Sequence, residues 1–532
     1  MIVTTFVSLN FFDKKVTNMI TISREALTCV DMQALLFNEG KISIDKTTLE
    51  RIDRSFRFLI DFSKDKIIYG INTGFGPMAQ YRVEQEDLIR LQYNLIRSHA
   101  AGSGKPLNPI QVKAAMIARL KTLSLGYSGI HKDAAIVLEQ LINNNITPFI
   151  PEHGGVGASG DLVQLAQLAL VIIGEGEVFY QNERLKTEDV FKALNIRPLQ
   201  VHLREGLALI NGTSVMTGIG FVNLFKAKHL VNWSLAASAM INELVESFDD
   251  HFSEELNGTK KHKGQQVIAE GLRVFLNDSK LIRKREDHLY NGRHSEKVIK
   301  QKVQEYYSLR CVPQILGPVI DTLTYAKTIL EGEINSVNDN PIINFEKGTV
   351  YHGGNFHGDY VSFEMDKVKT AITKLSILAE RQLNFLLNSK LNEILPPFVN
   401  LGTLGLNLGM QGAQFTATST VAENQSLSFP NYVHSIPNNN DNQDVVSMGT
   451  NSALIADKVI NNTFEVLAIE LMTLSQGFAK LELEEKASTR TRNILDKIRS
   501  ILPVFKEDST LYRQIAKLTD YLKNNDIQLV EL

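Results

Sequence analysis

The chain has 532 residues, 43% of them hydrophobic, and a formal net charge of -3, so it can bury a large core, and its length predicts two to four domains. The near-neutral charge argues against a nucleic-acid or anionic-membrane partner, and no apolar run reaches the roughly 18 residues that a membrane span needs. The two cysteines, Cys29 and Cys311, show no Cys/His ligand spacing, which argues against a disulfide scaffold or a metal site and favours a cytoplasmic location.

The N-terminal third predicts a mixture of short elements. Residues 1–18 have no basic start and are interrupted by Asp13-Lys14-Lys15, so we expect a disordered extension rather than a signal peptide. The pattern over 19–60 predicts a strand or turn followed by an amphipathic helix, and the glycines within 67–76 predict a loop. Apolar residues at helical spacing predict helices over 85–97, 110–125, 132–144 and 161–173. Two β-prone pieces, 177–182 and 186–202, predict a small hairpin region.

Long helical patterns begin at about residue 215 and predict a helix bundle. They cover 215–256, 319–334, 361–394 and 451–486. The connecting loops are rich in Asn, Gly, Asp and Pro, a composition that suits a polar active-site wall, and they cover 335–360, 395–412 and 429–450. We therefore expect an N-terminal catalytic-loop domain over 19–214, a central long-helix bundle over 215–490 and a C-terminal helical tail over 491–532.

The glycine-rich segment from Gly154 to Leu162 has three chemical interpretations. Gly155, Gly157 and Gly160 fit the GxGxxG spacing of a dinucleotide-binding turn, but Pro148 and Pro151 precede it where such a turn needs a central strand. The segment also suits a loop that caps the following helix. Alternatively, Ala158-Ser159-Gly160 can cyclise, because the glycine nitrogen can approach the Ala158 carbonyl closely and Ser159 carries a hydroxyl that can leave.

Several polar sets occur in loops or at helix ends, where catalytic groups are common. Each has an ordinary structural role when taken alone, such as a turn, a helix cap or a surface ion pair. They are Tyr69 in the glycine-rich loop, Ser98-His99, Asn211-Gly212-Thr213, Gln304 to Arg310, Gly353 to Asp359, and Glu423-Asn424.

Taken together, these sets resemble the aromatic amino-acid ammonia-lyase family over about residues 25–510. The motifs that carry the resemblance are Tyr69 to Gly76, Gly157 to Leu162, Leu209 to Thr213, Tyr307 to Cys311, Asn338 to Pro341 and Gly353 to His357. The resemblance implies a mainly α-helical fold of the fumarase/aspartase-like type, with a long-helix bundle and a smaller mixed N-terminal region that carries the cyclised tripeptide. It also implies a homotetramer in which each active site draws on three chains.

The resemblance assigns roles to individual residues. Ala158, Ser159 and Gly160 match the tripeptide that forms a 4-methylideneimidazole-5-one electrophile, so no external cofactor is implied. Tyr69 matches the general base, Arg310 the carboxylate clamp, and Asn211 and Tyr307 the groups that support the ring. The substrate-binding positions match Ser98, His99, Gln304, Asn355, Phe356 and Glu423.

The choice of amino acid stays open between tyrosine, histidine and phenylalanine. Ser98-His99 matches the pair that contacts the substrate ring, and histidine ammonia-lyases carry Ser-His there. Val163-Gln164 and the run from Asn438 to Asp444 instead resemble tyrosine ammonia-lyases of flavobacterial type, which favours conversion of L-tyrosine to p-coumarate. The alternatives are L-histidine to urocanate, a 2,3-aminomutase, an NAD-binding oxidoreductase and an inactive structural homologue.

Overall fold

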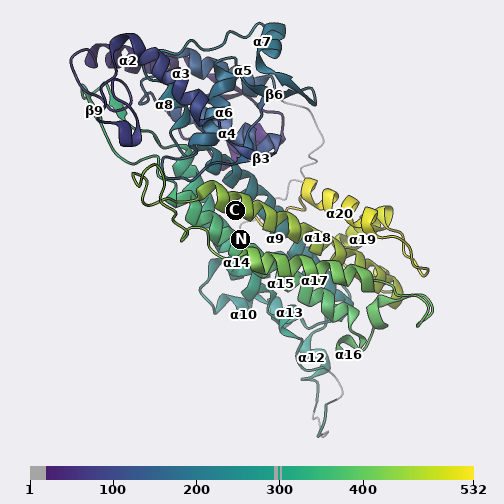
Figure 1. Ribbon diagram of the computed structural model, residues 1–532. Helices are drawn as coiled ribbons and strands as arrows, with labels where there is room; N and C mark the ends of the chain where they lie inside the picture. The colour runs from purple at the N-terminus through teal and green to yellow at the C-terminus, as the bar shows by residue number, and fades with distance from the viewer. Residues whose placement is uncertain (1–18, 293–296, 300–301) are drawn as a thin grey trace.

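Long helices lie side by side and form the bundle that dominates the chain (Figure 1). The computed structural model describes residues 19–292, 297–299 and 302–532, so the extension predicted over residues 1–18 lies outside the described residues. The bundle helices are α9 (Ser214–Leu244), α14 (Val312–Ile334), α15 (Asp359–Leu387), α17 (Gln411–Leu427) and α18 (Gly449–Leu481). The predicted fold class, a long-helix bundle with a smaller mixed N-terminal region, is confirmed.

The N-terminal region combines short helices with small sheets at one end of the bundle (Figure 1). Its helices are α1 (Cys29–Phe37), α2 (Lys46–Phe62), α3 (Leu88–His99), α4 (Pro109–Ser124), α5 (Asp133–Asn143), α6 (Leu162–Ile172), α7 (Thr187–Leu194) and α8 (Glu205–Ile210). Its strands are β1 (Met19–Ile22), β2 (Lys41–Ile44), β3 (Ser103–Pro106), β4 (Thr147–Pro148), β5 (Pro151–His153), β6 (Glu177–Tyr180) and β7 (Glu183–Lys186). β1 pairs parallel with β2, β3 pairs antiparallel with β5, and β6 lies antiparallel between β4 and β7.

The antiparallel pair β8 (Ile342–Asn344) and β9 (Thr349–Tyr351) lies beside α2 in the N-terminal region (Figure 1). Smaller helices pack along the bundle, and they are α10 (Glu254–Gly258), α11 (Lys263–Leu276), α12 (Arg285–His288), α13 (Tyr307–Arg310), α16 (Ser389–Asn392), α19 (Thr489–Ile501) and α20 (Tyr512–Asn524). No helix in the described part of the chain is long and apolar enough to cross a membrane.

Two helices join the N-terminal region to the bundle. Helix α4 begins at a capping box, in which the side chain of Asn108 accepts the backbone N–H of Gln111 and the side chain of Gln111 accepts the backbone N–H of Asn108. Pro109 occupies the first helical position. It is buried along almost its whole length and packs against α9, which is itself buried on nearly every face. A helix that is buried all round must lie at the centre of the protein, so α9 fixes the position of both parts.

The structure corrects the boundaries of two predicted bundle helices. The pattern over 215–256 ends early as a helix, because Glu246 has a φ of +49° and the chain turns after Leu244. The helix predicted over 319–334 begins at Val312, so Pro318 lies inside it. As the seventh residue of α14, Pro318 removes the hydrogen bond to the carbonyl of Gln314 and crowds that carbonyl, and close contact of Gly317 with Gln265 of α11 holds this part of α14 in place.

The prediction of a β-prone piece over 186–202 is wrong for most of that range. Its first residue ends β7, and the next eight residues form α7. Thr187, Val190 and Phe191 are the buried residues of that helix, which is a helical spacing rather than the alternation of a strand. Asn195 then ends α7 in the left-handed conformation.

Candidate active site

The glycine-rich loop that holds Ala158, Ser159 and Gly160 joins β5 to α6. Gly157 and Gly160 have φ angles of +75° and +73°, a region that favours glycine. A Cβ atom on Gly160 would lie 2.0 Å from the carbonyl oxygen of Gly212. Glycine is therefore required at position 160 both by the backbone conformation and by the available space.

The strand before this loop excludes the dinucleotide-binding interpretation. β5 pairs antiparallel with β3, whereas a dinucleotide-binding turn is the first turn of a parallel βαβ unit. The GxGxxG spacing of Gly155, Gly157 and Gly160 is therefore a sequence coincidence in a loop of different architecture.

Asp161 anchors the tripeptide to the start of α9. Its buried carboxylate accepts hydrogen bonds from the backbone N–H groups of Val215 at 2.8 Å and Met216 at 2.9 Å, and from the hydroxyl of Thr450. Burial raises the pKa of Asp161 to about 6, and the hydrogen bonds from Thr450, Met216 and Val215 oppose that rise. Above this pH the ionised carboxylate accepts hydrogen bonds from backbone N–H groups at the start of α9 that have no partner within the helix.

The starts of two more bundle helices bind the same loop. The carbonyl oxygen of Gly157 accepts the N–H of Gly358 at 3.0 Å and the hydroxyl of Ser447 at 3.1 Å. The carbonyl oxygen of Val156 accepts the N–H of Met448 at 2.9 Å. Gly358 and Met448 directly precede α15 and α18, so the positive ends of three long helices meet at the loop.

Each side-chain or carbonyl oxygen of the Ala158-Ser159 pair has its own side-chain partner. Asn211 Nδ2 donates to the carbonyl oxygen of Ser159 at 3.0 Å, and Gln443 Nε2 donates to the Ser159 hydroxyl oxygen at 3.0 Å. His357 Nδ1 lies 3.2 Å from the carbonyl oxygen of Ala158. Three segments far apart in the sequence therefore surround two adjacent residues.

Tyr69 lies half-buried in the predicted glycine-rich loop. Its phenolic oxygen accepts the backbone N–H of Gly76 at 3.1 Å. Gly76 lies against Asn439, because a Cβ atom on Gly76 would be 2.7 Å from Asn439 Nδ2. Asn439 belongs to the same short loop as Gln443, so one loop contacts both the Tyr69 segment and the tripeptide.

Ser98 and His99 are the last two residues of α3. This helix packs against α6, which follows the tripeptide, and against α8, which precedes Asn211. His99 Nδ1 lies 3.0 Å from the carbonyl oxygen of Leu95, which can only accept, so Nδ1 carries the proton. The Ser98 hydroxyl lies 3.1 Å from the same nitrogen. Burial lowers the pKa of His99, so the neutral ring leaves Nε2 free to accept a hydrogen bond.

Gln304, Tyr307 and Arg310 form a second cluster at α13. The Arg310 guanidinium lies 4.8 Å from the centre of the Tyr307 ring and donates to Gln304 Oε1. These residues line an open cavity of about 600 Å³ together with Glu305 and Arg381. Figure 1 shows α13 on the bundle and α6 in the N-terminal region, so this cluster and the tripeptide are well separated within one chain.

The remaining predicted site residues divide between the two parts. Asn355 is exposed and donates to the carbonyl oxygen of Val337 at 3.2 Å. Phe356 is half-buried and directly precedes His357, which contacts Ala158. Glu423 lies on α17 and accepts from Asn462 at 2.6 Å on the neighbouring helix α18. Its described contacts are thus with the bundle and not with the tripeptide.

Two contact residues were not predicted as part of the site. His357 belongs to the motif that ends Gly353-Gly354-Asn355-Phe356-His357, and Gln443 belongs to the asparagine-rich loop. The composition of that loop predicted a polar wall, but sequence alone does not indicate which of its amides reaches Ser159. The contact of Gln443 with Ser159 forms because the asparagine-rich loop folds back toward the start of α18.

The chain matches known proteins over nearly its whole length. The family model described as aromatic amino acid lyase matches residues 27–500. Tyrosine 2,3-aminomutase of Myxococcus sp. (strain Mx-B0) is 37% identical over 93% of this chain and 95% of its own length. Histidine ammonia-lyase of Bacillus subtilis (strain 168) is 36% identical over 96% of this chain and 97% of its own. The crystal structure of tyrosine aminomutase from Streptomyces globisporus has a TM-score of 0.90 at 34% identity and covers 95% of this chain and 96% of its own.

The required glycine conformation gives a stability prediction. We expect Gly160→Ala to lower the free energy of unfolding by about 2 kcal/mol or more, because a left-handed residue with a Cβ is strained and meets the Gly212 carbonyl. Gly353→Ala is the matched control, since nothing lies within 4 Å of a Cβ at that position. Urea titrations followed by circular dichroism measure both. Equal stability of the two variants contradicts the described loop conformation.

Proposed function

The chain belongs to the aromatic amino acid lyase family, and we propose that it removes ammonia from an aromatic L-amino acid without oxidation, with L-tyrosine giving p-coumarate as the preferred reaction. The observation that supports this most directly is the group of contacts around Ala158-Ser159-Gly160, in which Asn211, Gln443 and His357 each bond a different oxygen. The proposal includes a cytoplasmic location, which the free thiols of Cys29 and Cys311 support.

The residues around the tripeptide fit the prosthetic group that the family uses. Position 160 has no room for a side chain, and Asn211 bonds the one carbonyl oxygen, that of Ser159, which cyclisation retains. Once formed from Ala158, Ser159 and Gly160, the 4-methylideneimidazole-5-one supplies an electron-poor carbon that no unmodified side chain offers. Asn211 and the surrounding helix starts then stabilise negative charge on the retained oxygen.

Tyr69 and Arg310 have complementary tasks in the proposed reaction. Removing a proton from the substrate β-carbon needs a strong base, and a phenolate is far more basic than a carboxylate. The N–H of Gly76 fixes the position of the Tyr69 oxygen. The planar guanidinium of Arg310 suits a bidentate bond to the substrate carboxylate, with Tyr307 and Gln304 beside it.

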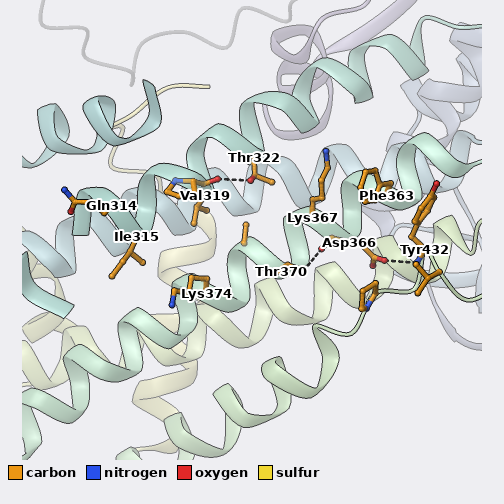
Figure 2. A pocket seen from close by; sticks show the side chains of 14 residues that line it. Gln314, Ile315, Val319, Thr322, Phe363, Asp366, Lys367, Thr370, Lys374 and Tyr432 are labelled. Carbon is orange, nitrogen blue, oxygen red and sulfur yellow. Dashed lines mark hydrogen bonds between the residues drawn. The ribbon is translucent and has the colours of Figure 1, made fainter. Parts of the chain in front are cut away.

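The separation of these two groups supports a homotetramer with shared active sites. Arg310 lies in the α13 cluster and Tyr69 in the N-terminal region, so a complete site needs Arg310 from a second copy of the chain. An apolar groove of about 570 Å³ between α14 and α15 also exposes side chains that a second copy of the chain would bury (Figure 2). Ile315, Val319 and Phe363 lie in this groove, and the Phe363 side chain is 49% exposed.

The hydrogen-bond state of His99 favours a substrate ring that carries a donor, such as the tyrosine hydroxyl, over the ring of phenylalanine. Its Nε2 can accept a hydrogen bond from the para hydroxyl of tyrosine, because Nδ1 is committed to the carbonyl of Leu95. Phenylalanine has no group to satisfy Nε2, so in this proposal it is a slower substrate. An amide, Gln443, rather than a carboxylate contacts Ser159, so this position contributes no charge that would select a basic imidazole.

Two alternatives have specific support. Histidine can also donate an imidazole N–H to His99 Nε2, and histidine ammonia-lyases are among the relatives. A 2,3-aminomutase uses the same elimination and then returns ammonia to the β-carbon, and proteins named tyrosine 2,3-aminomutase match at 37% identity. Chromatography of the products from tyrosine, histidine and phenylalanine tests all three, since p-coumarate, urocanate, cinnamate and β-tyrosine are separable.

Cyclisation of the tripeptide gives a prediction for the intact mass. We expect the purified protein to weigh about 36 Da less than its encoded mass, because ring formation releases two waters. Ser159→Ala keeps the full mass of its own sequence and loses nearly all activity, since alanine cannot form the methylidene carbon. Intact mass spectrometry of both proteins is the measurement. An unmodified wild-type protein contradicts the proposed function.

Sharing of the active site gives a complementation prediction. We expect Tyr69→Phe and Arg310→Ala each to lower kcat/KM by about 100-fold or more, because one lacks the base and the other the carboxylate clamp. Co-expression of the two variants restores about a quarter of the sites, since random mixing gives some sites an intact residue from each copy. Mixing the purified, separately assembled variants is the control. No recovery on co-expression contradicts the shared site.

The hydrogen-bond state of His99 gives a specificity prediction. We expect His99→Phe to shift the kcat/KM ratio of tyrosine to phenylalanine by about 10-fold or more toward phenylalanine, because the partner of the para hydroxyl is lost. If histidine is the natural substrate, its turnover is abolished instead and tyrosine stays poor with both proteins. Initial rates with the three amino acids measure this. Unchanged ratios show that His99 does not contact the substrate ring.

A further inference from the structure

Cyclisation of Ala158-Ser159-Gly160 has to dispose of two oxygen atoms and keep a third. The carbonyl oxygen of Ala158 and the hydroxyl oxygen of Ser159 leave as water, whereas the carbonyl oxygen of Ser159 stays on the ring. In the uncyclised chain described here, each of these atoms has a different partner: His357, Gln443 and Asn211 respectively. Only the oxygen of the first water loss has a partner that can carry and transfer a proton.

The two ring nitrogens of His357 contact different oxygen atoms. Nδ1 lies 3.2 Å from the carbonyl oxygen of Ala158, and Nε2 lies 3.2 Å from Oδ2 of Asp359. A peptide carbonyl and a carboxylate are both acceptors, so both contacts are hydrogen bonds only when each ring nitrogen bears a proton. An imidazolium at this position is oriented by Asp359 and directed at the carbonyl of Ala158.

The backbone next to His357 holds this geometry in place. Gly358 donates its N–H to the carbonyl oxygen of Gly157 at 3.0 Å, which ties the start of α15 to the residue before the tripeptide. A helix N-terminus by itself disfavours a cation. Asp359, the first residue of α15, offsets that effect with its carboxylate.

We propose that His357 is the general acid of the maturation reaction, with Asp359 as its positioning residue. The Gly160 nitrogen forms a bond to the carbonyl carbon of Ala158 and loses its proton, and the carbonyl oxygen takes the Nδ1 proton of His357 to become a hydroxyl. His357 takes up the proton that the Gly160 nitrogen releases and donates it to this hydroxyl, which leaves as the first water. Loss of the Ser159 N–H proton, which returns His357 to its protonated form, completes a carbon–nitrogen double bond. The protons lost from the two nitrogens balance those gained by the departing oxygen, so no oxidant or reductant is needed.

The second water loss follows at Ser159. Its Cα proton leaves and the bond from Cβ to the hydroxyl oxygen breaks, which gives the methylidene carbon and a second water. Gln443 Nε2 donates to that oxygen at 3.0 Å but has no proton to transfer at ordinary pH. Removal of the His357 side chain is therefore expected to affect the first water loss without affecting the fold. This inference rests on the proposed function, because it concerns formation of the same electrophile.

The test follows maturation by mass rather than by activity. Full-length protein is made by cell-free synthesis, samples are quenched over time, and mass spectrometry of the tripeptide-containing peptide reports the loss of each water. We expect His357→Asn to slow the first water loss by about 100-fold or more, so the uncyclised peptide accumulates. Asp359→Asn keeps the imidazole and gives a smaller slowing of the same step.

His352→Asn is the matched control, because it alters an exposed histidine of the same loop that has no described contact with the tripeptide. Circular dichroism and gel filtration of each variant check that the fold is retained, and the half-exposed Asp359 side chain makes its variant tolerant of change. Loss of both waters from His357→Asn at the wild-type rate overturns the inference, as does equal slowing in His352→Asn. A wild-type chain that never loses mass instead overturns the proposed function.

Discussion

The structure depends on the meeting of three helix N-termini at one short loop. Helices α9, α15 and α18 begin beside residues 156–161, and the loop bonds the starts of all three through Asp161 and the carbonyl oxygens of Gly157 and Val156. Each start needs acceptors for its free N–H groups, and the loop needs donors for its carbonyls. Because both needs are met by the same contacts, the tripeptide conformation is fixed by the bundle rather than by the loop.

This arrangement also fixes the electrostatics of the site. The positive ends of the helices favour electron density on nearby oxygens, and Asp161 places one carboxylate among them. Burial alone disfavours that carboxylate, and its pKa of about 6 reflects the balance with the donors from Thr450, Met216 and Val215. Without a carboxylate at position 161, the N–H groups of Val215 and Met216 lose their acceptor. The other carboxylate near the loop, that of Asp359, is half-exposed and contacts His357 rather than the tripeptide. The two side chains that contact the Ser159 oxygens, Asn211 and Gln443, are neutral amides and add no further charge.

Local patterns predict most of the long helices from the sequence, but they do not predict α11 or α17 and they predict few of the contacts in the site. The helices over 85–97, 110–125 and 132–144 correspond to α3, α4 and α5, because apolar spacing reports a buried helical face directly. The errors at 186–202 and at Pro318 arose where short-range signals compete with packing. The partners of Ser159 lie 52 and 284 residues away in the chain, and no local pattern encodes a contact at that separation. Two of the motifs supply Asn211 and His357, which contact the tripeptide, but the motifs do not indicate which atoms meet.

The division of the site between two parts of the chain follows from what each part must do. The proposed cyclisation requires the backbone of the tripeptide to be held tightly, and buried helix ends with a required glycine provide this. In the same proposal the α13 cluster receives the substrate carboxylate, and an arginine beside a 70% exposed tyrosine suits that task from the surface. Tight burial of the carboxylate-binding group would exclude the substrate, whereas exposure of the tripeptide would lose the conformation that brings its atoms together. The proposed cyclisation therefore takes place among buried helix ends, and the proposed substrate recognition takes place on the surface, where the proposal places a second copy of the chain.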